Sequence, residues 1–342
     1  MFFLVQKTRT LADLSRRILD NSGQHFIERN RVICLSGTVL DKFPRPSLKE
    51  EHYAYFGRKT NNNMFSEIAP FRRLCPFLLN SASDWLNRST VAADILKSIG
   101  ISSAMTLHFR SGQGSSSSYN QSDPAFDLGL DLDKHFDLFE KVEVDAVLQG
   151  TVYLESITFV KSGNKIQLVD LSSGERAYVL TILVLAFVTV DNTFVLFDEP
   201  ENSLHPKWQS SIVSDMWKTI SKVSVNSHTI IATHSPLIVS GAAGHSCYIC
   251  DLQSDKGWIP SQMYGKTSDS ILKEQFSLLS PRSYSSIIAI QNALSAATTI
   301  ESDPNKFRIA SDELLGLNLK FDNDDPLYAT INTIKELRGA ML

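Results

Sequence analysis

The sequence predicts an α/β protein in which a mainly parallel sheet is flanked by helices. Three observations support this fold class. From residue 166 onward, strand-like patterns alternate with helical ones, as expected for βαβ units. The run Phe194–Phe197 is apolar throughout, which is typical of a strand buried on both faces. Asp198 and Glu199 follow this run directly, and open α/β sheets bind their ligands at the carboxyl ends of strands.

The N-terminal part of the chain mixes helical and strand-like patterns. Leu11, Leu14 and Ile18 share one face of the first predicted helix. A run rich in serine and glycine, SGQGSSSSYNQSD, predicts a loop. The predicted elements are a helix at residues 8–21, strands at 31–37 and 52–57, a largely helical stretch at 74–99, the loop at 111–123 and a helical insertion at 126–148.

The C-terminal part shows the regular strand–helix alternation and then becomes helical. The predicted elements are helices at residues 173–190 and 206–221, strands at 193–197, 228–233 and 246–252, a helix or turn at 236–241, helical spacing at 271–299 and one amphipathic helix in the tail at 301–342. We therefore divide the chain into four parts: residues 1–110, the loop and insertion at 111–165, the core at 166–260 and a helical region at 261–342.

The composition is that of an ordinary globular protein. The 342 residues are 43% hydrophobic and 20% charged, and the net charge of −4 provides no overall basic field for nucleic acid. The longest apolar run, residues 178–190, is too short to span a bilayer, so we expect a cytoplasmic protein with no membrane contact. Cys247 and Cys250 form one CxxC, which favours a buried strand over a zinc site because no second pair accompanies it.

Polar residues at the start of the helix at 173–190 admit two interpretations. Ser172, Ser173, Gly174 and Glu175 can present backbone N–H groups and a hydroxyl to a phosphate. The same residues also suit an N-cap, with Ser172 or Ser173 capping the helix and Glu175 supporting its first turn. The sequence leaves both interpretations open.

Two predicted strand ends carry residues suited to phosphate chemistry. Asp198 can hold Mg²⁺, directly or through water, and Glu199 can orient a water molecule and take its proton. His234 follows the apolar strand at 228–233 and can donate to a phosphate or position water. The alternatives are a solvated strand end for the carboxylates and a satisfied polar group for the histidine.

The order and spacing of these three features resemble the ABC-type ATPase heads of the RecF, SMC and OLD-like kind. LSSGE at residues 171–175 resembles the signature motif, which implies ATP contacts for Ser172, Ser173, Gly174 and Glu175. FVLFDEP at 194–200 resembles Walker B with its catalytic glutamate, and THSP at 233–236 the switch-histidine loop. ENSLHP at residues 201–206, which begins with Glu201, occupies the place of the D-loop, and its site residues are Asn202, Ser203 and His205. The resemblance implies a P-loop NTPase sheet.

The phosphate-wrapping loop of this family, GxxxxGK[ST], has only a trace in the sequence. Lys7 and Thr8 fit its end, but Met1–Gln6 supplies none of the glycines. Three explanations stay open: a late or truncated start of the chain, a degenerate loop with weakened ATPase activity, or coincidence. As written, the segment should bind phosphate poorly, because Phe and Leu cannot replace glycine at positions of positive φ.

The resemblance also implies a mechanism and partners. ATP and Mg²⁺ would lie in a head-to-tail homodimer, between Lys7, Thr8 and Asp198 of one head and Ser173 and Gly174 of the other, with Thr8 and Asp198 toward the metal. The catalytic carboxylate would activate water and the switch histidine would sense the γ-phosphate.

The chain carries no evident nuclease motif of its own. It therefore looks like the ATPase subunit of Septu-type or retron-associated anti-phage systems, regulating a partner nuclease through residues 261–342, with nucleic acid possible in the assembly. The alternatives are a RecF/SMC-like DNA-repair ATPase and a catalytically silent scaffold.

Overall fold

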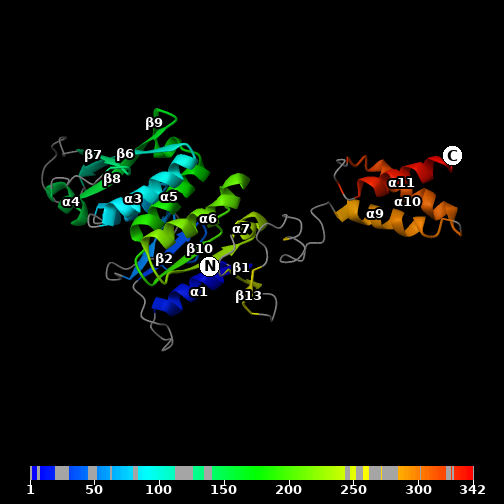
Figure 1. Ribbon diagram of the computed structural model, residues 1–342, viewed down its shortest axis with the longest axis horizontal. Helices are drawn as coiled ribbons and strands as arrows, with labels where there is room; N and C mark the ends of the chain where they lie inside the picture. The colour runs from blue at the N-terminus through cyan, green and yellow to red at the C-terminus, as the bar shows by residue number, and fades with distance from the viewer. Residues whose placement is uncertain are drawn as a thin grey trace. The chain divides into compact units, whose positions relative to one another are not determined.

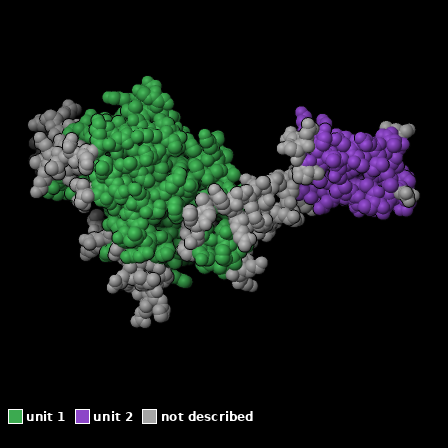
Figure 2. Space-filling view, viewed as in Figure 1, with its two compact units in different colours: residues 1–271 green, residues 272–342 purple. Residues whose placement is uncertain are grey.

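The computed structural model describes most of the chain: residues 2–5, 8–19, 31–44, 52–61, 64–79, 84–111, 126–134, 141–242, 247–251, 257–261, 271, 284–300, 302–320, 325 and 327–341. The chain forms two compact units, residues 1–271 and residues 272–342 (Figure 2). Unit 1 contains the sheets and the candidate site. Unit 2 is a group of helices with a core of its own.

The main sheet of unit 1 has seven strands in the order β13-β12-β1-β11-β10-β2-β3. Every neighbouring pair is parallel except β12 with β13. The strands are β1 (Phe2–Val5), β2 (Arg31–Ser36), β3 (Tyr53–Tyr55), β10 (Thr193–Asp198), β11 (His228–Thr233), β12 (Tyr248–Asp251) and β13 (Ile259–Pro260). This mainly parallel sheet, flanked by helices, confirms the predicted fold class.

Helices cover both faces of this sheet (Figure 1). On one face, Leu11 and Ala12 of α1 (Thr8–Leu19) pack against Val32, Leu196 and Ile230 from three adjacent strands. On the other face lie α5 (Ser173–Val188) and α6 (Pro206–Val223), with α3 (Trp85–Ser98) beyond them. A strand covered on both sides buries side chains at successive positions, which explains the apolar runs at 32–35 in β2, 194–197 in β10 and 230–232 in β11.

Helix α5 is buried along most of its length and ends against two arginines from other elements. Arg31 Nη1 donates to the Val188 carbonyl at 2.6 Å. Arg88 Nη1 donates to the carbonyls of Ala186 and Thr189 at 2.7 and 2.9 Å. The last carbonyls of a helix have no partners within it, so these guanidinium groups satisfy them and fix the end of α5.

A second, antiparallel sheet precedes α5 and corrects one prediction. Its order is β7-β6-β8-β9, with β6 (Ile101–Ser111), β7 (Phe126–Asp131), β8 (Val152–Lys161) and β9 (Asn164–Gln167). The predicted helical insertion at 126–148 is wrong for residues 126–131, which form β7. Leu128 and Leu130 are buried while Asp127 and Gly129 are exposed, and this alternation is that of a strand. A short helix, α4 (Lys141–Leu148), is the helical part of the insertion.

Other element boundaries also differ from expectation. The helical stretch at 74–99 is two helices, α2 (Ala69–Leu79) and α3, and the strand at 52–57 shortens to β3. A hairpin of β4 (Lys59–Asn61) and β5 (Met64–Phe65) precedes α2. Most of the predicted loop at 111–123 lies outside the described residues. Cys250 is a buried free thiol within β12, as the strand interpretation of the CxxC requires.

Unit 2 corrects the prediction of one helix in the tail. Its described part contains α9 (Tyr284–Ala297), α10 (Pro304–Gly316) and α11 (Tyr328–Gly339), of which the last two lie in the tail. Asp303 caps α10 through the N–H of Lys306, and Pro304 occupies the first helical position. Phe307 lies at the centre of the core that the three helices share.

Candidate functional site

The candidate site lies at the carboxyl edge of the main sheet, where β2, β10 and β11 end side by side. Asp198, the last residue of β10, is in register with Ser36 of β2 and Ala232 of β11. Its side chain is fully buried. Mg²⁺ in nucleotide sites usually binds through one or two carboxylates together with phosphates and water. A buried carboxylate at this edge fits that requirement.

Glu199 leaves the strand in a strained conformation. Its φ is 47°, in the left-handed region that a residue with a side chain rarely adopts. Its N–H is held by the Ala232 carbonyl at 2.8 Å, which continues the β10–β11 pairing by one residue. Strain of this kind costs about 1–3 kcal/mol and persists only where the surroundings enforce it. Here it turns the Glu199 carboxylate away from the sheet interior.

The Glu199 carboxylate meets two other predicted site residues. Asn202 Nδ2 donates to Glu199 Oε2 at 2.7 Å. His234 Nε2 lies 3.5 Å from Glu199 Oε1, and the imidazole is about half exposed. The structure therefore brings the predicted catalytic pair and one D-loop residue into a single cluster next to Asp198. A carboxylate and an accessible imidazole can each act as a general acid or a general base, giving a proton to a reacting group or taking one from it.

Glu201, the first residue of the predicted D-loop segment, received no role of its own from the sequence, yet its side chain contacts the loop that carries His234. Glu201 Oε1 accepts the backbone N–H of His234 at 2.6 Å, and Oε2 accepts the Thr233 hydroxyl at 2.8 Å. Burial raises the pKa of Glu201, although its hydrogen bonds act in the opposite direction. The available signal was a third carboxylate within DEPE, only two residues beyond Glu199.

The start of α5 is capped as one of the two interpretations expected. The Ser172 hydroxyl accepts the N–H of Glu175 at 3.2 Å, and the Glu175 carboxylate accepts the N–H of Ser172 at 2.9 Å. Lys161 also bonds the buried Glu175. Burial acts to raise the Glu175 pKa, but the bonds from Lys161 and Ser172 outweigh it and leave the pKa lowered. Glu175 is thus a structural residue here, while Ser173 stays exposed at the first helical position.

Gly174 lets the signature segment approach the predicted D-loop. A Cβ at this position would lie 2.6 Å from the Ser203 carbonyl oxygen and 3.2 Å from the Trp208 ring. Ser203 itself has a φ of 75°, so the loop is strained where it meets the helix. His205, two residues after Ser203, is the N-cap of α6, and its side chain accepts the N–H of Lys207 at 3.3 Å. The structure therefore places Ser173, Asn202 and Ser203 around one surface.

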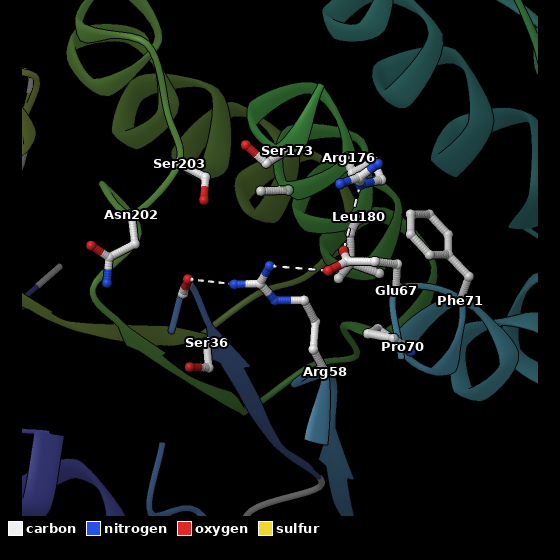
Figure 3. A pocket seen from close by; sticks show the side chains of 12 residues that line it. Ser36, Arg58, Glu67, Pro70, Phe71, Ser173, Arg176, Leu180, Asn202 and Ser203 are labelled. Carbon is white, nitrogen blue, oxygen red and sulfur yellow. Dashed lines mark hydrogen bonds and ion pairs between the residues drawn. The ribbon is translucent and has the colours of Figure 1, made fainter. Parts of the chain in front are cut away.

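A small cavity of about 30 Å³ opens between these segments (Figure 3). Arg58 and Arg176 reach toward Glu67 from two sides of this cavity, with N–O distances of 3.3 and 3.5 Å. Arg58 also donates to the Gly37 carbonyl at 3.1 Å. Ser173 and the loop at 202–203 line the cavity as well, together with the apolar side chains of Pro70, Phe71 and Leu180. The cavity can hold one or two water molecules. Its two guanidinium groups and one carboxylate make it electropositive.

The remaining predicted ATP contacts lie at the N-terminus. Lys7 lies outside the described residues, and Thr8 begins α1 with a side chain that is also outside them. The backbone of β1 is described. Val5, the last residue of this strand, is in register with Thr233 of β11, one residue before His234. Strand β1 therefore ends at the same sheet edge as β10 and β11, which lead to Asp198 and His234.

A known protein family matches the region that holds most of this site. A family described as "AAA domain, putative AbiEii toxin, Type IV TA system" matches residues 39–240, more than half of the chain. The chain belongs to this AAA domain family. The matched range includes the signature segment at 172–175, the carboxylates that follow β10, and His234. Lys7 and Thr8 precede it.

Two individual proteins are also similar to part of this chain. The "Retron Vc95 probable ATPase" of Vibrio cholerae serotype O1 biovar El Tor is 27% identical over 193 residues, which are 53% of this chain and 32% of that protein. "Protein ea59" of Escherichia phage lambda is 39% identical over 74 residues, 21% of this chain and 13% of that protein. The match therefore spans about a third of the retron protein's length and less of the phage protein's. Within the described part of the AAA domain, no helix has the length and apolar character needed to cross a bilayer.

Proposed function

We propose that this AAA domain hydrolyses ATP with the help of Mg²⁺ at the carboxyl edge of its main sheet. One observation carries the proposal: the Glu199 carboxylate meets the Asn202 amide and the His234 imidazole, one residue beyond the buried Asp198 at the end of β10. Phosphoryl transfer requires a metal-holding carboxylate and a group that positions the attacking water. This edge of the sheet supplies both, and the family membership supports the same chemistry.

Each residue of the cluster has a proposed role. Asp198 and Thr8 would hold Mg²⁺, which when bound neutralises phosphate charge. Glu199 would orient the attacking water and accept its proton. His234 would donate to an oxygen of the γ-phosphate, which its partial exposure allows. Lys7 would contact the phosphates from the segment after β1.

We further propose that two copies of the chain bind ATP between them. The exposed Ser173 hydroxyl and the first turn of α5 stand beside Asn202 and Ser203 on one surface of the head. In the dimer, this surface would meet the nucleotide held by the opposite copy, and Ser172–Glu175 would act from the partner side. Closing and opening of the dimer would then follow ATP binding and hydrolysis.

We propose anti-phage defence as the biological setting, on the strength of the retron relative. That protein is named a probable ATPase, and the match covers 53% of this chain. We propose that this chain regulates a nuclease effector in a retron-associated or Septu-type system. The helical region at 261–342, which contains unit 2, would be the effector-binding part. The alternatives of a DNA-repair head and a silent scaffold predict salt-dependent DNA binding and no turnover, respectively.

The test compares ATP hydrolysis by the full chain with that of Glu199→Gln. We expect Mg²⁺-dependent phosphate release that falls at least about 100-fold in the variant, since the carboxylate that takes the proton is lost. Glu155→Gln, on the antiparallel sheet, is the matched control and should keep the full rate. Equal, near-zero rates for the wild type and Glu199→Gln would reject the ATPase and leave the scaffold. Light scattering of Glu199→Gln with and without ATP tests the dimer.

A further inference from the structure

Three acidic residues lie within four positions at the end of β10, and two of them, Glu199 and Glu201, contact the loop after β11. Asp198 ends the strand and Glu199 faces the cluster with Asn202 and His234. Glu201 accepts two hydrogen bonds from the end of β11, from the His234 N–H at 2.6 Å and from the Thr233 hydroxyl at 2.8 Å. Its carboxylate thus connects the loop that carries Glu199 to the loop that carries His234.

The His234 side chain has little else to hold it. Its imidazole is about half exposed, and its closest described partner is the Glu199 carboxylate at 3.5 Å. Its backbone is fixed on both sides instead. Glu201 holds the His234 N–H, and the next residue, Ser235, is buried and caps α7 (Pro236–Ser240) through the N–H groups of Leu237 and Ile238.

A second connection reinforces the same junction from α6. The Ser235 hydroxyl donates to Gln209 Oε1 at 2.7 Å, and Gln209 Nε2 donates to the Leu204 carbonyl at 3.0 Å. The loops after β10 and β11 are therefore tied twice. Only the connection through Glu201 reaches the backbone of His234 itself, so it sets the position from which the imidazole extends.

We propose that Glu201 is a positioning residue for hydrolysis, which holds His234 against Glu199 by accepting the His234 N–H and the Thr233 hydroxyl. This inference rests on the proposed ATPase function. Glu201 touches neither the nucleotide nor the water in this scheme. Its substitution should therefore reduce kcat and leave the KM for ATP nearly unchanged, because a misplaced catalytic group affects the chemical step rather than substrate binding.

Conservative variants separate positioning from proton transfer. In Glu201→Gln, the amide oxygen can still accept the His234 N–H, and the amide nitrogen can donate to the Thr233 hydroxyl after that hydroxyl rotates. We expect Glu201→Gln to keep kcat within about 3-fold of the wild type, whereas Glu201→Ala loses about 10- to 100-fold. A residue that itself transferred a proton or bound metal would lose activity equally in both variants.

A spectroscopic measurement tests the contact without relying on turnover. The chain has eight histidines, so selective ¹⁵N-histidine labelling gives at most eight backbone amide signals. His234→Asn identifies the signal of interest. A short bond to a carboxylate shifts an amide proton downfield. We expect this shift in the wild type, its loss in Glu201→Ala and its retention in Glu201→Gln. Glu155→Ala is the control for both measurements.

The outcomes distinguish this inference from the proposed function. An inactive wild type rejects the ATPase, and the His234 amide signal then decides the Glu201 contact alone. An active wild type with an unchanged kcat in Glu201→Ala overturns the inference and leaves the ATPase intact. Equal losses in Glu201→Gln and Glu201→Ala also overturn it, as does a His234 signal that Glu201→Ala does not move. Thermal unfolding of each variant confirms that the comparisons are made on folded protein.

Discussion

Gly174 allows the first turn of α5 to lie directly against the loop after β10. The missing Cβ matters because the Ser203 carbonyl would be 2.6 Å from it and the backbone cannot yield as a long side chain would. Gly37 has the same role at the other end of the site, where a Cβ would lie 2.0 Å from the Glu199 carbonyl oxygen. Two glycines therefore set how closely the backbones around Glu199 and Ser203 approach.

Gly174→Ala tests this close approach. Alanine favours a helix by about 1 kcal/mol over glycine, so propensity alone predicts stabilisation. We expect the opposite, a loss of about 1–3 kcal/mol in the free energy of unfolding, because the Ser203 loop must shift. Urea titration gives the value. Gly129→Ala, whose Cβ meets nothing within 4 Å, is the control and should be neutral or stabilising. A stabilised Gly174→Ala would show that the loop yields freely.

Asp41 provides a pH test at a second buried carboxylate. It is 2% exposed and accepts the Phe43 N–H and the Tyr55 hydroxyl. Burial raises its pKa in the folded protein above the ordinary 3.8, although these hydrogen bonds oppose the effect. An acid with a raised folded-state pKa binds its proton more tightly when folded. Its contribution to stability is therefore complete below the unfolded pKa and is lost as pH rises through the folded one.

Asp41→Asn removes this titration while keeping an acceptor for the Phe43 N–H. We expect the stability of the wild type relative to Asp41→Asn to fall as pH rises above about 4, by at most about 1.4 kcal/mol per pH unit, and then to level off. Urea unfolding of both proteins across this range measures the difference. If the stability of the wild type relative to Asp41→Asn rose with pH instead, the pKa of Asp41 would not be raised in the folded protein.

At the scale of the elements, apolar runs and helix caps were predictable from the sequence, and long-range pairing was not. The strand at 193–198 and the capping box of α5 follow from short patterns, a continuous apolar run and Ser172 three residues before Glu175. The strand β7 was missed because its charges suggested a helix surface, although its leucines alternate. Only pairing with β6, distant in the sequence, makes that alternation decisive.

The candidate site shows the same division. Asp198, Glu199 and His234 could be predicted because their motifs are local. The role of Glu201 could not, since its partners lie at the end of another strand. The pairing of Arg58 and Arg176 with Glu67 could not be predicted either. These residues come from separate segments, which meet only in the folded chain. Fold and motif can be read from the sequence, while the contacts that position the motif require the structure.

The contacts of Arg176 permit a prediction about how α5 is held. Arg176 donates to the carbonyls of Val169 and Leu171 at 2.9 and 2.8 Å and pairs with Glu67. The carbonyls belong to the short turn η2 (Leu168–Asp170) and the residue after it, so Arg176 ties this turn to the helix. We expect Arg176→Ala to cost about 1–2 kcal/mol of unfolding free energy, because it removes two hydrogen bonds to a charged group.

Glu67→Ala is the matched comparison for this contact. The Glu67 carboxylate is 40% exposed, and exposed ion pairs contribute little, so we expect a loss below about 1 kcal/mol. A double-mutant cycle by urea unfolding measures the coupling between the two residues. We expect Arg176→Ala to lower the free energy of unfolding more than Glu67→Ala does. The reverse order would show that the ion pair, rather than the two carbonyl contacts, holds the turn.

At the scale of the whole molecule, the chain separates its proposed chemistry from a second folded part. All the residues of the candidate site belong to unit 1. Unit 2 has its own hydrophobic core, in which α9, α10 and α11 share Ala293, Phe307, Leu314, Ile331 and Ile334. A core of this kind can be stable without the rest of the chain if its apolar surface is covered within the unit. The two activities that we propose, hydrolysis and effector binding, can therefore be tested on separate parts.

Residues 272–342 should fold when produced alone. We expect a helical circular dichroism spectrum and a cooperative thermal transition, because the core residues of the three helices contact one another. Phe307 is 0% exposed, so Phe307→Ala should cost about 3–5 kcal/mol, enough to unfold a unit of this size. Ile309, on the same helix and 60% exposed, is the control, and Ile309→Ala should leave the transition almost unchanged. A fragment that lacks a cooperative transition would mean that unit 2 depends on unit 1 for its stability, and effector binding would then have to be measured on the full chain.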